Sequence, residues 1–135
     1  MSDFAIRQMT KDDEPFIFRA WLEGFWPNFA GNVVMPKSDY LVTWHRVIER
    51  ILADPATRTL VAHVEGHPDQ LLGFACGCDH VAHWFYTKQP FRGLGIAGEL
   101  IHQLDVRDHV FSHWNHSGAL GHWRYDPTLL KEYGG

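Results

Sequence analysis

The chain has 135 residues, a size that suits one domain with a single hydrophobic core. Hydrophobic residues make up 45% of it and charged residues 21%, which is typical of a globular protein and excludes a disordered chain. The formal net charge is -4 at pH 7, so we do not expect broad binding to nucleic acid through neutralised phosphates. No apolar run approaches the roughly 18 residues of a membrane span, and the first residues lack the apolar core of a secretory signal. We therefore expect a cytoplasmic protein that does not contact membranes.

Hydrophobic periodicity and turn residues predict alternating strands and helices. The predicted elements are a strand at 4–9, a helix from a capping box at Thr10 and Asp13 to about Gly24, a helix from Ser38 or Asp39 to Asp54, a hairpin with strands at 59–64 and 71–78, a strand at 81–87, a helix from Gly95 to about Asp108, and a strand at 110–114. The tail from Asn115 to Gly135 is polar and only weakly periodic. No repeat or linker divides the sequence, so we predict one α/β domain over residues 1–135.

The second strand of the hairpin has two unlike faces. Simple alternation places four side chains on one face, those of Leu72, Phe74, Cys76 and Cys78. Glycine and alanine leave the other face nearly bare, so another group can approach it closely. The two cysteines lie one residue apart on the same side of a strand, where an ordinary disulfide does not form, and we expect reduced thiols.

The strongest chemical signal is a glycine-containing turn between a predicted strand and a predicted helix. Arg92, Gly93 and Gly95 lie in this turn. The first amides of a helix have no acceptors within the helix and lie at the positive end of its dipole, where anions bind. Glycine lets a phosphate oxygen come within about 3 Å of the main chain. The turn is therefore either an anion-binding site or simply a tight strand-to-helix connection.

The sequence Arg92-Gly93-Leu94-Gly95-Ile96-Ala97 resembles the Arg/Gln-x-x-Gly-x-Gly/Ala signature of the GCN5-related N-acetyltransferase (GNAT) superfamily. The element order from Phe4 to Trp114 is also similar to that of the superfamily, and residues 16–22 and 45–52 resemble small phage-encoded members. The resemblance implies an α/β fold with a mixed, mostly antiparallel sheet flanked by helices. Residues 126–135 are too few for the two antiparallel strands that usually end the fold, so we expect a shortened C-terminal end. The acceptor pocket is then either open or completed by a second copy in a homodimer.

The resemblance also implies an acyl-CoA site and acetyl transfer to a primary amine whose identity the sequence does not reveal. The pyrophosphate would bind the amides of the turn, and the pantetheine arm would pair with the preceding strand. The implied acyl-CoA residues are Phe85, Thr87, Arg92, Gly93, Leu94, Gly95, Ala97, Gly98 and Asn115. Acetyl-CoA is the expected acyl donor, and no metal ligand is assigned.

Two residues are candidates for proton transfer. An amine with a pKa near 10 must lose a proton before it attacks, which takes a base or a water relay. The position where family members often carry a carboxylate falls near Val81, so we select His83, whose strand parity matches that of Phe85 and Thr87; the alternative is a packed histidine. The resemblance implies that the acid is a tyrosine in a helix that follows an Asn after the fifth strand; Asn115 follows the strand here, and Tyr125 is the candidate.

Other interpretations remain open. A GNAT-like fold could bind CoA, a protein or nucleic acid without catalysis, as the missing carboxylate and the short tail suggest. An amine on a nucleobase or bound to DNA is a further possible acceptor, although the acidic charge balance opposes it. A metal site is a third possibility, from His109, His113, His116, His122, Cys76 and Cys78, but their spacing is not that of a zinc site. Four aromatic residues either contact the acceptor or belong to the core or a dimer interface: Trp21, Phe25, Trp26 and Phe29.

Overall fold

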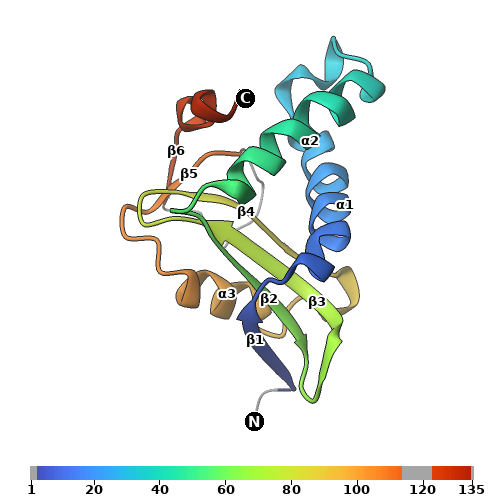
Figure 1. The fold of residues 1–135 in the computed structure, drawn as a ribbon, viewed down its shortest axis with the longest axis vertical. Coiled ribbons are helices and arrows are strands. Elements are labelled where there is room, and N and C mark those ends of the chain that lie inside the picture. The colour runs from blue at the N-terminus through green and yellow to red at the C-terminus, as the bar shows by residue number, and fades with distance from the viewer. Residues whose placement is uncertain (1–2, 114–122, 135) are drawn as a thin grey trace.

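A computed structural model describes residues 3–113 and 123–134. Its strands and helices are β1 (Phe4–Gln8), α1 (Glu14–Phe25), α2 (Lys37–Ala53), β2 (Arg58–Val64), β3 (His67–Gly77), β4 (Ala82–Thr87), α3 (Ile96–Leu104), β5 (Val110–Phe111) and β6 (Arg124–Tyr125). Short 3₁₀ segments join them, named η1 (Lys11–Asp13), η2 (Trp26–Asn28), η3 (Ala30–Val33), η4 (Gln89–Phe91) and η6 (Pro127–Tyr133). Figure 1 shows α1 and α2 on one side of the sheet and α3 on the other. The expected mixed α/β fold is confirmed.

The six strands form one sheet in the order β1-β2-β3-β4-β5-β6. The pairs β1–β2, β2–β3 and β3–β4 are antiparallel, whereas β5 is parallel to both β4 and β6. In the described residues, β4 and β5 pair only at Ala82 and Phe111. Among residues 3–113 and 123–134, no strand pairs with this edge of β4 from Trp84 to Thr87.

Two apolar clusters hold the helices on the sheet. On one face, Trp21 of α1 and Ile48 of α2 pack with Phe74 of β3, and all three are fully buried. On the other face, Leu100 of α3 packs against Ala75 of β3. Each helix is amphipathic, with its apolar residues three and four apart, which is why only one side of it is buried.

The entry to α1 is fixed by the predicted capping box. The amide of Thr10 donates to Asp13 Oδ2 over 2.7 Å, and the Arg7 guanidinium donates to both carboxylate oxygens of Asp13 over 2.7 and 3.0 Å. Burial alone would raise the pKa of Asp13, but the bonds from Arg7 and Thr10 outweigh it and hold the pKa below its ordinary value. The pair thereby ties the start of α1 to β1.

A bulge in β3 overturns one expectation about its faces. The register of β2 and β3 shifts where Ala62 pairs with Gly73 and His63 with Leu71, so Leu72 is skipped. Leu72 consequently packs with the α3 cluster, while Phe74 and Cys76 pack against α1 and α2. The predicted common face is therefore wrong for Leu72, because a bulge interrupts the strict alternation of side chains. Cys78 lies beyond the end of the strand.

Several predicted boundaries also differ. β3 begins at His67, which pairs with Val64 although residues 67–70, predicted as a turn, are exposed and offer no apolar face. α3 ends at Leu104 because Asp105 adopts the left-handed conformation, with φ at +56°. β5 contains only two residues, and Trp114, the end of the predicted strand, lies outside the described residues.

The end of the tail is more ordered than its weak periodicity suggested. The Asp126 side chain accepts from the Thr128 amide over 3.1 Å and caps η6. Leu130 and Tyr133, three residues apart, then pack into the α1–α2 cluster with exposures of 3% and 7%. No helix within residues 3–113 and 123–134 is long and apolar enough to cross a membrane.

Candidate functional site

The turn between β4 and α3 has a conformation that favours glycine. Gly93 and Gly95 have φ values of +85° and +84°, and no atom lies within 4 Å of the position that a Cβ would take at either residue. The glycines are therefore required by the backbone conformation and not by packing. Gly95 is the N-cap of α3, and the next three amides have no acceptor within the helix. The positive end of this nine-residue helix thus faces open space.

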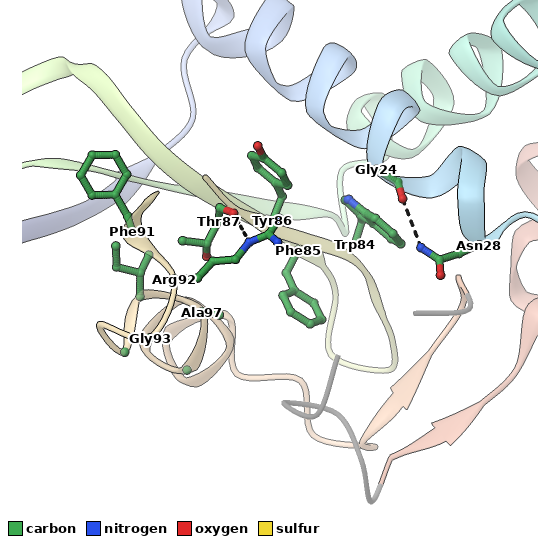
Figure 2. Close-up of a pocket in the computed structure, with 13 residues that line it drawn as sticks. Gly24, Asn28, Trp84, Phe85, Tyr86, Thr87, Phe91, Arg92, Gly93 and Ala97 are labelled. Carbon is green, nitrogen blue, oxygen red and sulfur yellow. Dashed lines mark hydrogen bonds between the residues drawn. The ribbon is translucent and has the colours of Figure 1, made fainter. Parts of the chain in front are cut away.

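This turn forms one wall of a cavity of about 490 Å³, here called the α3–β4 pocket (Figure 2). β4 forms the opposite wall, and the end of α1 with η2 closes one end. The lining residues are Gly24, Asn28, Trp84, Phe85, Tyr86, Thr87, Phe91, Arg92, Gly93, Gly95, Ile96, Ala97 and Gly98. The pocket therefore combines a helix N-terminus with the edge of β4 that has no strand partner among residues 3–113 and 123–134.

Three buried side-chain polar atoms on β4 lack hydrogen-bond partners among the described residues; one is His83 Nε2, and the other two belong to residues that line the pocket. These two are Trp84 Nε1 and Thr87 Oγ1. Buried polar groups are normally paired, so Trp84 Nε1 and Thr87 Oγ1 can make contacts that residues 3–113 and 123–134 do not supply. An elongated ligand with an anionic group at one end and amides along its length fits the helix end, the open strand edge and these two atoms.

Arg92 holds the turn against the end of β4. Its Nε donates to the Thr87 carbonyl over 2.9 Å, and its guanidinium lies 5.8 Å from the centre of the Tyr86 ring (Figure 2). The residue is exposed, so its positive charge remains at the mouth of the pocket. Arg92 therefore has a structural contact as well as a charge suited to an anion.

Most of the predicted acyl-CoA residues lie together. The α3–β4 pocket is lined by Phe85, Thr87, Arg92, Gly93, Gly95, Ala97 and Gly98. Leu94 is not a lining residue, and its side chain is 64% exposed. Asn115 lies outside the described residues. Gly24 and Asn28, which the sequence did not single out, complete the wall from the α1 side.

The expectation that His83 shares a face with Phe85 and Thr87 is wrong. The register of β3 and β4 shifts between the pairs Cys76–Trp84 and Gly77–Ala82, and His83 is the skipped residue. Its ring turns toward Tyr133, does not line the α3–β4 pocket and is only 2% exposed. Burial lowers the pKa of His83 to about 4, so the imidazole is neutral and a weak base at pH 7.

A chain of buried hydrogen bonds explains the environment of His83. The indole N–H of Trp21 donates to His113 Nε2 over 3.1 Å. Indole is only a donor, so His113 carries its proton on Nδ1 and donates to Ser112 Oγ over 3.0 Å. The Ser112 hydroxyl then donates to His83 Nδ1 over 2.7 Å. Burial lowers the pKa of His113 well below its ordinary value, and the network therefore requires both imidazoles to be neutral.

A second cavity, here called the aromatic pocket, has a volume of about 460 Å³. It is lined by Phe25, Asn28, Phe29, Ala30, Trp44, Ser112, Tyr125, Pro127, Thr128, Leu130 and Lys131. Asn28 lines both pockets, so the two cavities meet at this residue. No carboxylate is among the described residues that line either of them.

Tyr125, the predicted acid, lies in the aromatic pocket. Its ring stacks on Phe111 with centres 5.4 Å apart, and the residue is 41% exposed. Partial burial raises the pKa of its hydroxyl, which is therefore protonated at pH 7. Of the four aromatic residues with two possible roles, Phe25 and Phe29 line this pocket, whereas Trp21 is a fully buried core residue.

The described part of the chain, residues 3–113 and 123–134, contains no group of three or more His, Cys, Asp or Glu arranged to hold a metal ion. Cys76 is buried, and its sulfur lies 3.3 Å from Thr59 Oγ1. Burial raises the pKa of this thiol to about 12, which disfavours the thiolate that binds metal. His116 and His122 lie outside the described residues.

The fold of this chain is similar to that of solved acetyltransferase structures. A candidate acetyl transferase from Pyrococcus furiosus superposes with a TM-score of 0.67 and 15% identity, over 98% of this chain and 92% of that protein. The histone acetyltransferase HPA2 and related acetyltransferase from Corynebacterium glutamicum superposes with a TM-score of 0.57 and 17% identity, over 76% of this chain and 70% of that protein. The GCN5-related N-acetyltransferase (aminotransferase, class II) from Rhodopseudomonas palustris has a TM-score of 0.53 and 19% identity, over 78% of this chain and 65% of that protein.

The chain therefore has the GNAT fold, as its signature at residues 92–97 predicted. No family model and no curated protein matches the sequence. The similarity thus lies in the arrangement of the elements, at identities below 20% in these three comparisons.

Proposed function

We propose that the chain is an acetyl-CoA-dependent N-acyltransferase that transfers an acetyl group to a primary amine. The observation that supports this proposal most is the α3–β4 pocket, where the helix N-terminus and Arg92 adjoin the open edge of β4. Acetyl-CoA is a thioester with an anionic pyrophosphate and a chain of amides, and both parts have matching groups here.

The proposed contacts of acetyl-CoA divide along the pocket. The pyrophosphate would accept hydrogen bonds from the amides between Gly93 and Gly98, next to the positive charge of Arg92. The pantetheine amides would pair with the main chain of β4 near Phe85 and Thr87, in the way that a strand extends a sheet. Bound acetyl-CoA supplies an activated acyl group, and Asn28 lies at the end of the pocket that joins the aromatic pocket.

The proposed reaction needs few side chains. After the ammonium has lost one proton to solvent, the neutral amine forms a C–N bond, the C–S bond breaks, and the second proton leaves the nitrogen and replaces the one that the sulfur receives. We propose that the Tyr125 hydroxyl donates to the sulfur, because it lines the adjoining pocket and stays protonated at pH 7. We assign no general base, since His83 lies outside both pockets.

Replacing Tyr125 with phenylalanine tests this assignment. We expect kcat to fall by roughly 10²-fold, the usual effect of losing a general acid, while the KM for acetyl-CoA stays within twofold. Steady-state release of CoA measures both parameters. The ring still packs on Phe111, so thermal stability serves as the control for folding. An unchanged kcat would remove Tyr125 from the proposed mechanism.

The first test of the function is a thermal-shift titration of the wild-type chain with acetyl-CoA, CoA and 3'-dephospho-CoA. A ligand at about 100 times its dissociation constant adds about 2.7 kcal/mol to the stability of the folded state, so we expect a saturable rise in melting temperature. A rise with no turnover of any amine would favour a GNAT-fold protein that binds CoA without catalysis. No rise at millimolar ligand would reject the proposed acyl-CoA site.

A further inference from the structure

The aromatic pocket has the size, lining and position of a second substrate site. We propose that it binds the acyl acceptor, and that this acceptor is a primary monoamine with one apolar, preferably aromatic, group. The proposal rests on the proposed function, because it assumes that the thioester lies in the adjoining α3–β4 pocket. The walls, the charge and the shared residue Asn28 each support it.

The walls of the aromatic pocket are mostly rings held in place by the core. Phe25 and Trp44 are 5% and 6% exposed, with ring centres 5.0 Å apart. Phe29 lies against Trp44 with ring centres 5.6 Å apart. Leu130 and Pro127 of η6 complete the apolar lining. Because these rings pack on one another at steep angles, a flat apolar group can add edge-to-face contacts to a surface that is already formed.

The charge of the residues that line the aromatic pocket favours an acceptor with one positive charge over an acceptor with several. Lys131 is the single charged residue among those that line the aromatic pocket. Asp126 precedes η6, but its carboxylate already accepts from the Thr128 hydroxyl over 2.5 Å and lies 3.5 Å from Arg124. A polyamine, an aminoglycoside or a lysine-rich peptide would bring several positive charges next to Lys131 without a carboxylate to receive them. A monoamine brings one charge, which it can hold at the junction of the pockets.

Asn28 supplies an acceptor at that junction. Its Nδ2 donates to the Gly24 carbonyl over 3.1 Å, which fixes the orientation of the side-chain amide (Figure 2). Its Oδ1 therefore points away from Gly24 and remains an acceptor for the N–H groups of an amine. The acceptor's nitrogen would lie at Asn28 with the thioester on one side, while its apolar group occupies the aromatic pocket on the other side.

The test compares phenethylamine with spermidine. Calorimetry on the chain saturated with CoA measures amine binding, and CoA release in the presence of acetyl-CoA measures turnover. We expect phenethylamine to bind saturably and to have a kcat/KM at least tenfold above that of spermidine. An equal or higher kcat/KM for spermidine would overturn the inference, as would CoA binding without any binding of phenethylamine. Absence of CoA binding would instead reject the proposed function, whatever phenethylamine does.

Two variants test whether the acceptor amine binds at Asn28 and in the aromatic pocket. Asn28→Ala should raise the KM for phenethylamine by about tenfold with a smaller change in kcat, because a hydrogen bond to a charged group is lost. Lys131→Glu should raise the kcat/KM for spermidine relative to that for phenethylamine by several-fold. The matched control is Lys37→Glu, which makes the same charge change at an exposed residue outside both pockets. If Lys37→Glu and Lys131→Glu shift the ratio equally, the aromatic pocket is not the acceptor site.

Discussion

Replacing Gly95 with glutamate is expected to lower the affinity for acetyl-CoA by roughly 100-fold or more. The new carboxylate would stand at the N-terminus of α3, where the pyrophosphate is proposed to bind, so it would both fill the space and repel the anion. No atom lies within 4 Å of the new Cβ, so the side chain does not disturb the packing of the fold. Calorimetric titration with acetyl-CoA measures the loss.

Backbone strain is the effect that needs a control. Gly95 has a φ of +84°, and a residue with a Cβ loses about 1–2 kcal/mol of stability in this left-handed region. Gly66, in the turn between β2 and β3, has a φ of +82° and equally open space around the missing Cβ. Gly66→Glu should therefore lower the melting temperature by a similar amount and leave acetyl-CoA affinity unchanged. Equal affinities for both variants and the wild type would reject the assigned turn.

Acid is expected to destabilise the protein well above the pH at which its carboxylates protonate. Burial lowers the pKa of His83 to about 4, against 6.5 in the unfolded chain, so protons bind more strongly to the unfolded state. This contribution to stability is complete above pH 6.5 and is lost as the pH falls toward 4. At pH 5 the loss from His83 alone is about 2 kcal/mol. Burial lowers the pKa of His113 as well, which has the same effect on stability. The negative charge of Asp54 raises the pKa of His83, but by less than burial lowers it.

Urea unfolding at pH 7.5 and pH 5.0 measures this loss directly. His83→Asn keeps an acceptor near the position of Nδ1 for the Ser112 hydroxyl but cannot protonate, so the variant should lose less stability between the two pH values. His67→Asn is the matched control at an exposed histidine and should behave like the wild type. A wild-type free energy of unfolding that is equal at both pH values would contradict the proposed neutrality of the Trp21–His113–Ser112–His83 network.

The sequence predicted the parts of the site that are local in the chain. The turn at residues 92–98 is defined by consecutive residues, and most of its predicted acyl-CoA residues lie in one pocket. Asn28 was missed because its position depends on how α1 packs over β4, a relation more than 50 residues apart that no local spacing reveals. Leu72 and His83 were assigned to the wrong faces because alternation assumes a regular strand, and each is the extra residue of a bulge. The one local signal that was available and overlooked is the Asp126-Pro127 cap of η6.

The separation of β4 from β5 makes the proposed acyl-CoA contacts depend mainly on the main chain. An amide at the start of α3 or along the edge of β4 has the same hydrogen-bonding groups whatever side chain it carries, proline excepted. The exposed Leu94 can therefore carry other side chains, whereas Gly93 and Gly95, which have positive φ, are restricted to glycine. Side chains that choose the acceptor can then diversify in the neighbouring pocket without altering how the donor is held.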